Sequence, residues 1–469
     1  MSRAKGKEQW AKRGVGVRAA SSKHTPQIRD RSNRSHLPSL MVAIVLAVVP
    51  FHAFLTVWAS TGLGNYTLLR LWPETIILAL VAWLLWSRQV GKTWHALGKS
   101  RLAWPIAIYL GVNGLYFIVT ILWGDAGLHA ASYGLLLNIR HVAWFVVAYA
   151  VARNSAWLSH HWQRLLIWPL VVVSVFAVLQ FFVLPSDILK HFGYIKDVTI
   201  TPVQTINQDT STIRVQSFLR GANPLGAYLV LTVSLVLAAT IRRWQKIGLA
   251  LVSIVAMIVS FSRSAWLGLV VALSAQAAAT RGLVRGRRVV LSLLIALLMA
   301  LVGAIFVLHS NQGFKTAFLH VNDHSTAPQT SNEGRLAALK EGINDVTHEP
   351  FGRGVGTSGP ASVYHAEDKS RNSENYFLSL GQETGWLSLG VFVLICYRLA
   401  VLLYRTKTAF PRALFASFVG LTLVNFLSYA WSDTTLVYLW WGLAAIAIAA
   451  FDNSHLSFTK KSANSTNEN

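Results

Sequence analysis

Long runs of apolar residues, separated by short polar or basic loops, dominate this chain. Twelve such runs reach about 17–25 residues, the length at which a helix crosses a hydrocarbon core roughly 30 Å thick. They lie at 38–60, 68–86, 102–123, 134–152, 163–184, 224–240, 245–261, 264–280, 288–308, 375–403, 411–431 and 435–451. The pattern predicts an all-α, polytopic helical membrane protein with about 12 transmembrane helices. Because only Ser262 and Arg263 separate the runs 245–261 and 264–280, one long broken helix there, and eleven spans, is the alternative.

The charge of the loops alternates along the chain, which predicts how the helices are oriented. The basic stretches are 1–36, 88–101, 153–164, 242–246, 281–288, 398–412 and 460–461. The short loops 61–67, 124–133 and 432–435 contain no Lys or Arg. Because basic loops stay on the cytoplasmic side, we expect both termini in the cytoplasm and the long loops 185–223 and 309–374 on the external face.

The predicted topology accounts for most of the net charge of +23. Most of the basic residues belong to the cytoplasmic loops, where they face the anionic headgroups of membrane lipids. No basic and aromatic surface remains that would indicate a nucleic-acid partner. The single cysteine, Cys396, excludes disulfides and paired-cysteine zinc sites within one chain, and no acidic cluster has metal-ligand spacing.

Three parts follow from this organisation. Residues 1–37 are predicted to be a disordered basic cytoplasmic tail, 38–451 the transmembrane domain, and 452–469 a polar cytoplasmic tail. Within the loop 309–374, a helix start at Ser331 precedes apolar residues at helical spacing. These residues are Leu336, Leu339, Ile343 and Val346, and Pro350 follows them. The loop is therefore expected to form a small amphipathic cap on the outer membrane surface.

Arginines gather on the predicted external side. Arg214 and Arg220 precede Asn223 and Pro224, a pair in which Asn can cap a helix and Pro fits its first turn. A helix N-terminus beside arginines is a candidate anion site. Arg263 lies between two short apolar runs, and a charge at membrane depth is by default a functional candidate. The alternative is that these arginines anchor the helices at the membrane interface.

A glycine-rich segment contains a further arginine. Gly352, Gly354 and Gly356 superficially resemble a nucleotide-binding loop, but no strand precedes them and no Lys-Ser/Thr follows. A tight turn that places Arg353 near the membrane is the better interpretation.

Other titratable residues lie before the run 375–403 and inside the run 134–152. A carboxylate at Glu374 or an imidazole at His365 could take a proton from an acceptor hydroxyl, although Glu374 could equally be a helix-dipole partner. Arg140 and His141 are intramembrane ionisable residues, which usually pair or line a cavity. Glu74 and Asp433 are partner candidates for arginines on the outer side.

Seven short motifs follow one another along the chain. They are Arg214-Val-Gln-Ser-Phe-Leu219, Asn223-Pro-Leu-Gly-Ala-Tyr-Leu229, Ser260-Phe-Ser-Arg-Ser-Ala265, Gly334-Arg335, Pro350-Phe-Gly-Arg-Gly354, Glu374-Asn-Tyr-Phe-Leu378 and Gln382-Glu-Thr-Gly385. In this order, the motifs resemble the O-antigen ligase and Wzy-type polymerase superfamily of bacterial membrane glycosyltransferases. The resemblance covers about 210–390 by motif and the rest by helix count.

The resemblance implies a glycan transferase of the bacterial inner membrane with an external active site. Its donor would be an undecaprenyl-diphosphate-linked glycan and its acceptor a hydroxyl of a glycan or lipid-glycan, with no cofactor or metal. Arg214 and Arg263 match the family arginines that hold the diphosphate, with Arg220 and Arg353 as further candidates. Ligases of the family have His-Asn where this chain has Glu374-Asn375. Either Glu374 replaces that histidine as the base, or His365 does, or the enzyme is a polymerase-type relative with a different arrangement. A transporter or flippase of a lipid-linked glycan, and a non-catalytic scaffold of envelope assembly, are the alternatives.

Overall fold

The computed structural model shows a helical protein with one short hairpin in the part of the chain that it describes. That part consists of residues 36–124, 126–206, 209–280, 291, 295, 331–364, 371 and 373–466. The helices are α1 (His36–Val48), α2 (His52–Leu63), α3 (Tyr66–Leu69), α4 (Trp72–Trp86), α5 (Val90–Lys99), α6 (Ala103–Trp123), α7 (Leu128–Asn154), α8 (Trp157–Phe182), α9 (Ala222–Ala238), α10 (Arg243–Val259), α11 (Arg263–Ala279), α14 (Ser331–His348), α15 (Tyr376–Arg405), α16 (Ala409–Leu427) and α17 (Thr434–Thr466). Short 3-10 turns are η2 (Val49–Phe51), η3 (Ile188–Phe192), η5 (Gly359–Tyr364) and η7 (Ala430–Ser432).

The expectation of an all-α, polytopic membrane protein is confirmed, whereas the count of twelve spans is not. Seven described helical segments are long and apolar enough to cross a membrane. They are His36–Leu63, Ala103–Trp123, Leu128–Asn154, Trp157–Phe182, Tyr376–Arg405, Ala409–Leu427 and Thr434–Asn453. Helices α4 and α9 are apolar but shorter, and α10 and α11 have 17 residues each. The predicted run 288–308 lies almost entirely outside the described residues, as do the tail 1–35 and His365.

The runs 245–261 and 264–280 form two helices, and the chain turns back between them. Phe261 adopts the left-handed conformation, with φ 50°. The indole Nε1 of Trp266 donates a hydrogen bond to the carbonyl oxygen of Met257, 3.0 Å away. In one continuous helix, nine residues would separate these positions by about 13.5 Å. An unbroken helix through this point is therefore excluded, and the two runs are separate helices.

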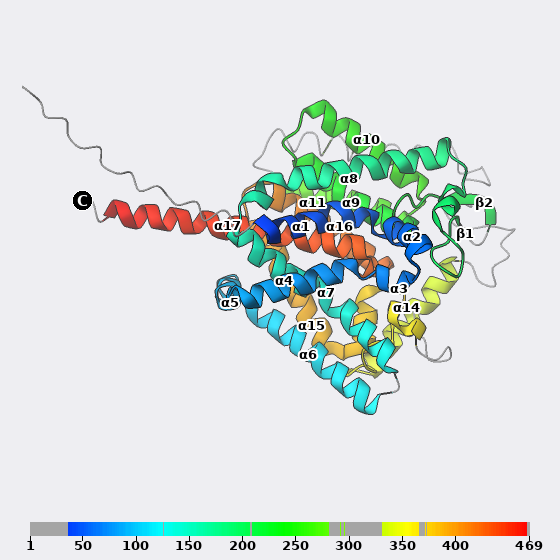
Figure 1. The fold of residues 1–469 in the computed structure, drawn as a ribbon, viewed down its shortest axis with the longest axis horizontal. Helices are drawn as coiled ribbons and strands as arrows, with labels where there is room; N and C mark the ends of the chain where they lie inside the picture. The colour runs from blue at the N-terminus through cyan, green and yellow to red at the C-terminus, as the bar shows by residue number, and fades with distance from the viewer. Residues whose placement is uncertain are drawn as a thin grey trace, which may run out of the picture.

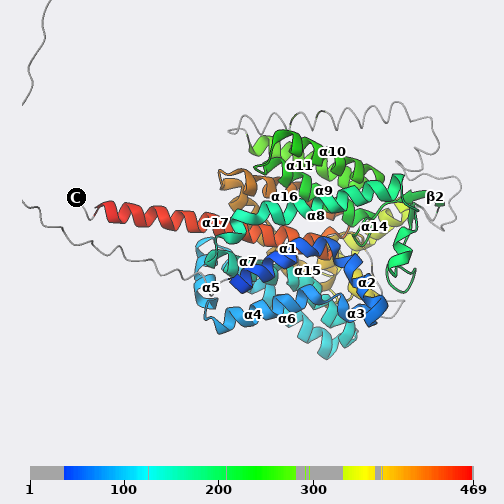
Figure 2. The ribbon, with the colours of Figure 1, turned by 45° about the horizontal axis from the view of Figure 1, so that its top comes forward.

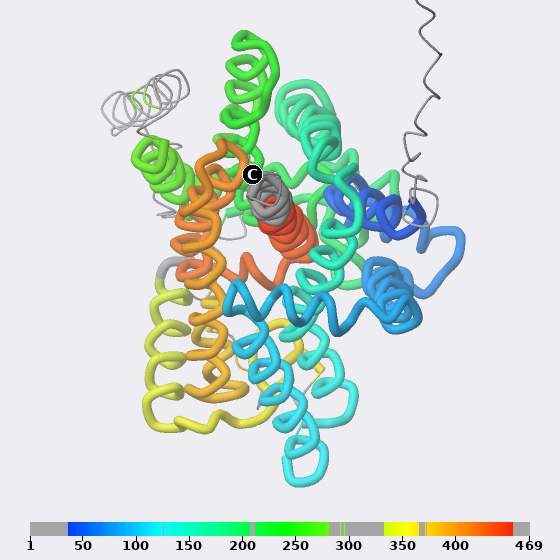
Figure 3. The backbone as a smooth tube through the Cα atoms, turned by 90° about the vertical axis from the view of Figure 1, so that its left-hand side faces the viewer, coloured from blue at the N-terminus to red at the C-terminus, as the bar shows by residue number. Residues whose placement is uncertain are grey.

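Helix α17 forms the centre of the bundle. Figure 3 shows it surrounded by the other helices, and Figure 2 shows α10 and α11 on one side of it and α4 and α6 on the other. In its most apolar stretch 83% of the residues are buried. Trp440 and Trp441 are fully buried there and pack edge-to-face with Trp431 before the helix. The helix also continues beyond the predicted span, as far as Thr466.

The functional candidates gather at one end of the bundle. Figure 1 shows α2, α3, α14 and the hairpin together at the end opposite the C-terminus. The hairpin pairs β1 (Gln204–Ile206) with β2 (Asp209–Arg214) in antiparallel order, with Gln204 opposite Arg214. The helix predicted in the loop 309–374 is confirmed as α14. The predicted glycine turn is confirmed as well, since Gly352, Gly354 and Gly356 all have positive φ.

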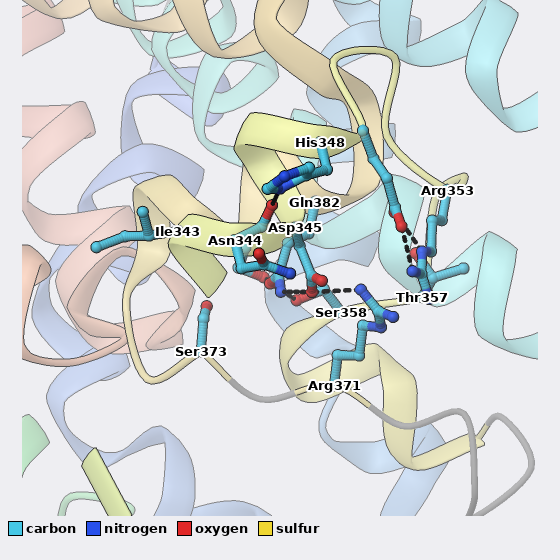
Figure 4. Close-up of polar contacts among 12 residues, drawn as sticks. Ile343, Asn344, Asp345, His348, Arg353, Thr357, Ser358, Arg371, Ser373 and Gln382 are labelled. Atoms are coloured by element: carbon cyan, nitrogen blue, oxygen red, sulfur yellow. Dashed lines mark hydrogen bonds and ion pairs between the residues drawn. The ribbon is translucent and has the colours of Figure 1, made fainter. Parts of the chain in front are cut away.

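Polar contacts hold α14 on the start of α15 (Figure 4). Asp345 of α14 accepts a hydrogen bond from Gln382 Nε2 (2.7 Å) and forms an ion pair with Arg371. The Gln382 side chain also accepts a hydrogen bond from Ser358. Its neighbour Glu383 is buried, where Oε2 accepts from the Asn138 amide and Oε1 from the Gly356 N–H. The segment 382–385 therefore has a structural role, because it fixes the cap and the glycine turn.

Gly420→Ala should destabilise the fold measurably. A Cβ at Gly420 of α16 would lie 2.3 Å from the carbonyl oxygen of Gly268 in α11, where small residues let the two helices approach closely. Overpacking of this kind costs about 1–3 kcal/mol. We expect a lower unfolding temperature of the detergent-solubilised protein, measured by intrinsic fluorescence. Gly390→Ala in α15 is the matched control, because its Cβ would meet nothing within 4 Å. Equal unfolding temperatures for the two variants would refute this packing.

Candidate functional site

A polar cavity of about 360 Å³ opens where the start of α9, the cap helix α14 and the α16–α17 connection meet. It is lined by Gln204, Arg220, Gly221, Ala222, Asn223, Pro224, Arg335, Pro360, Glu374, Ser428, Tyr429, Ala430, Ser432 and Asp433. Four of these residues are ionisable acids or arginines that come from four separate segments of the chain. Such convergence of charged groups in one hollow is typical of a binding or catalytic site.

A second cavity, of about 380 Å³, is mostly apolar and shares a wall with the first. It is lined by Arg263, Ser264, Leu267, Arg335, Leu336, Leu339, Ser373, Glu374, Phe426 and Leu427. Several of its apolar side chains are largely exposed, among them Leu336, Phe426 and Leu267. An apolar hollow of this kind suits a hydrocarbon chain more than a sugar.

Arg335 and Glu374 form the wall between the two cavities, because both residues line both. Arg335 Nε lies 2.8 Å from Glu374 Oε2, and both side chains are partly exposed. Glu374 has φ 47°, which is uncommon for a residue other than glycine. The next residue, Asn375, caps α15 by accepting hydrogen bonds from the N–H groups of Phe377 and Leu378.

Arg214 and Arg263 lie close to Arg335. Burial, followed by the neighbouring guanidinium groups of Arg335 and Arg263, lowers the pKa of Arg214 to about 10. Arg214 therefore stays protonated at neutral pH, and the three arginines concentrate positive charge beside the two cavities. This charge favours a ligand with more than one negative charge.

Hydrogen bonds fix the position of Arg214. Its Nε donates to the carbonyl oxygen of Ser260 (3.0 Å), just before α11, and its Nη2 donates to Asn223 Oδ1 (2.7 Å). Asn223 thus does not cap α9 as predicted, because the helix begins at Ala222 and the Ala222 N–H donates to Gln204 Oε1. Arg214 also lines a separate cavity of about 260 Å³, together with Phe181, Leu184 and Phe261 among others.

The remaining predicted residues divide into two groups. Arg220 lines the polar cavity, close to Asp433. Burial raises the pKa of the Asp433 carboxyl, while the Leu436 N–H and then Arg220 act in the opposite direction. Arg353 instead forms an ion pair with Glu349 on the cap and lines neither cavity. His365 lies outside the described residues.

Arg140 is paired, as expected of an intramembrane charge, and its partner is Glu74, one of the two acids predicted to pair with arginines. Its Nη1 lies 3.3 Å from Glu74 Oε1, and both side chains are almost completely buried. Its Nη2 donates to the carbonyl oxygen of Ser432 (2.6 Å), and its Nη1 also donates to Thr434. Because Ser432 and Asp433 line the polar cavity, this buried arginine supports one side of the site from within the bundle.

Arg335 is the main residue that the sequence interpretation did not select for the site. The feature of the sequence that could have identified it is the Gly334-Arg335 motif. Its position on the shared wall becomes visible only when α14 is placed against α15. Tyr429 and Asn223 were also not selected, and both line the polar cavity.

Comparison with known proteins supports the resemblance. Residues 247–393 match the O-antigen ligase family. An O-antigen polymerase of Salmonella muenchen is 33% identical over 67 residues, which is 14% of this chain and 17% of that relative. The chain therefore matches only a small part of the curated relative. The family match contains α11, α14 and most of α15, and with them Arg263, Arg335 and Glu374. These comparisons confirm that this polytopic membrane protein is similar to the O-antigen ligase and polymerase superfamily over the segment that carries much of the candidate site.

Proposed function

We propose that the protein is a glycosyltransferase of the bacterial inner membrane that acts on the external face without a metal. It moves a glycan from an undecaprenyl-diphosphate-linked donor to a hydroxyl of a glycan or lipid-glycan acceptor. The observation that carries this proposal is a group of three arginines: Arg335 in the wall shared by a polar and an apolar cavity, Arg263 in the lining of the apolar cavity, and Arg214 near both guanidinium groups. The family similarity supports the same class of reaction.

The two cavities match the two halves of such a donor. The apolar cavity accepts the first part of the polyprenyl chain, and the polar cavity accepts the sugar that is transferred. The diphosphate then lies between them, beside Arg263 and Arg335. Guanidinium groups bind phosphate oxygens through paired hydrogen bonds and stay charged. They therefore stabilise the negative charge that develops on the leaving diphosphate, which is often a large catalytic effect.

Glu374 is positioned to act as the general base. The acceptor hydroxyl gives its proton to the Glu374 carboxylate while its oxygen forms a bond to the anomeric carbon of the donor sugar. The bond between that carbon and the diphosphate oxygen breaks, and its electron pair leaves with the diphosphate. In the structure Glu374 is paired with Arg335. A bound diphosphate competes for this guanidinium group, so donor binding releases the carboxylate for proton transfer. His365 remains the alternative base.

A product assay in detergent tests this function against the transporter alternative. Purified protein is mixed with an undecaprenyl-diphosphate-linked oligosaccharide, with and without a lipid-glycan acceptor. Transfer produces either a glycosylated acceptor or a longer lipid-linked glycan, and mass spectrometry identifies each. A transporter forms no new glycosidic bond in detergent, where no membrane separates two compartments. If substrate is recovered unchanged under all conditions, the proposed reaction is wrong.

We predict that the cap helix α14 faces the external side and the α7–α8 connection the cytoplasm. Cys396 is the single cysteine and is buried, so single cysteines can be introduced in a Cys396→Ala background. Ala337 of α14 and Ala156 between α7 and α8 are both exposed. A membrane-impermeant maleimide added to cells with a permeabilised outer membrane should label Ala337→Cys and not Ala156→Cys. The reverse labelling would place the site on the cytoplasmic face and exclude an external reaction.

A further inference from the structure

A group of aromatic rings lies beside the polar cavity and has no role in the chemistry described above. His129 and Tyr133 come from the first turns of α7, and Tyr364 ends the turn η5. We call these three residues the aromatic platform. The rings of His129 and Tyr364 have centroids 4.2 Å apart, and those of Tyr133 and Tyr364 meet edge-to-face at 5.6 Å. His129 is exposed, and Tyr364 has 37% of its surface accessible.

Arg70 contacts two residues of the platform, Tyr133 and Tyr364, and holds them in place. Its guanidinium carbon lies 4.6 Å from the centre of the Tyr133 ring, and its Nη2 donates to the Tyr364 hydroxyl at 3.2 Å. A cation over one ring and a hydrogen bond to another restrict how both rings tilt. The platform is therefore an ordered, partly exposed aromatic surface with polar groups at its edge.

The platform lies near the polar cavity. Pro360 lines that cavity, and Tyr364 lies at the other end of the same short turn. Tyr66 of α3 gives a second link. Burial raises the pKa of Tyr66, while Arg220 and then Arg70 lower it. Tyr66 therefore lies near both Arg220, which lines the cavity, and Arg70, which supports the platform.

We propose that the aromatic platform binds sugar rings of the glycan as they extend from the polar cavity. This inference rests on the proposed function. A pyranose ring has an apolar face of C–H groups, which packs on the electron-rich face of an aromatic ring, and a rim of hydroxyls, which the imidazole of His129 and the hydroxyl of Tyr364 can bind. The platform thus selects for a glycan of several sugar units, because a single sugar in the cavity does not reach it.

Binding of a free glycan tests the platform separately from the reaction. The probe is the oligosaccharide released by mild acid from the lipid-linked glycans of the host bacterium, and the readout is saturation-transfer NMR with the full-length protein in detergent. We expect Tyr364→Ala and Tyr133→Ala to bind about 5- to 10-fold more weakly. Tyr364→Phe keeps the ring and loses the hydroxyl, with its contacts to Arg70 and to the glycan, so its binding should lie between that of wild type and that of Tyr364→Ala. Tyr397→Ala removes another exposed aromatic side chain, on α15, and should have no effect.

Several outcomes would overturn the inference. They are no binding of the glycan by wild-type protein, unchanged binding in both alanine variants, or an equal loss in Tyr364→Phe and Tyr364→Ala. Unchanged binding would indicate that the rings only anchor the protein at the membrane interface. If an alanine variant fails to fold, the exposed His129→Ala provides the same test. Ring-dependent binding without any transfer would support the platform while refuting the proposed reaction.

Transfer kinetics then show which glycan occupies the platform. If it holds the donor chain, Tyr364→Ala should raise KM for donors of several sugars about 5- to 10-fold and leave a single-sugar donor unchanged. If it holds the acceptor chain, the rise appears in KM for the acceptor. Both results support the inference, and an equal loss of kcat with every donor and acceptor would contradict it.

Discussion

Arg263→Ala should reduce the rate of glycan transfer by about 100- to 1000-fold, the size expected when a group that stabilises developing charge is removed. Arg263 is half-buried at the first position of α11 and lines the apolar cavity beside Arg335. In the proposed reaction the leaving diphosphate gains negative charge as its bond to the sugar breaks, and Arg263 stabilises that charge. The measurement is the initial rate with saturating donor and acceptor.

The lysine variant separates charge from geometry. Arg263→Lys keeps a positive charge but loses the paired hydrogen bonds of the guanidinium group, so it should remain well below wild type. Arg243→Ala is the matched control, because Arg243 is an exposed arginine at the first position of the adjacent helix α10, far from both cavities. Wild-type rates in Arg263→Ala, or a loss as large in Arg243→Ala, would contradict the assigned role.

Glu374→Gln should lower kcat by about 100- to 10,000-fold, the range for loss of a general base, with little change in the KM of the donor. Glutamine keeps the shape of the side chain and can still accept a hydrogen bond from Arg335, but it cannot take the proton of the acceptor. Glu349→Gln is the control, because Glu349 is a carboxylate that pairs with Arg353 next to the cap helix, outside both cavities.

His365→Ala distinguishes the two candidate bases. Full activity in Glu374→Gln together with loss of activity in His365→Ala would assign the base to His365. Full activity in both variants would mean that neither Glu374 nor His365 takes the proton of the acceptor, and a mechanism that depends on the arginines alone would remain.

The helices could be predicted from the sequence because the apolar runs are long and share the same hydrocarbon environment. Each predicted run in the described part forms a helix, and α14 begins at Ser331 as its start signal indicated. The pairing of Arg140 with Glu74 was also predictable, since a charge buried in a membrane needs a partner. The number of spans was less predictable, because short apolar helices such as α9 and α10 are not long enough to decide whether they cross.

The site itself needed the tertiary structure. Sequence spacing placed Arg214, Arg263 and Glu374 on one end of the bundle but not around common cavities. Arg335 is far from the other arginines along the chain, and only the contacts between α14 and α15 place it on the shared wall. Gln382 and Glu383 belong to one of the matched motifs, but in the structure their side chains bond to Asp345 of α14 and Asn138 of α7 and hold the fold together.

The most direct test of the proposed reaction is the balance between its two products. Purified protein is given a donor with separate labels in the glycan and the undecaprenyl diphosphate, and both labels are followed over time. Transfer predicts that free undecaprenyl diphosphate appears in an amount equal to the glycan joined to the acceptor, and that Arg263→Ala slows both equally. Glycan that leaves the donor without release of undecaprenyl diphosphate, or no change in either label, would contradict the account.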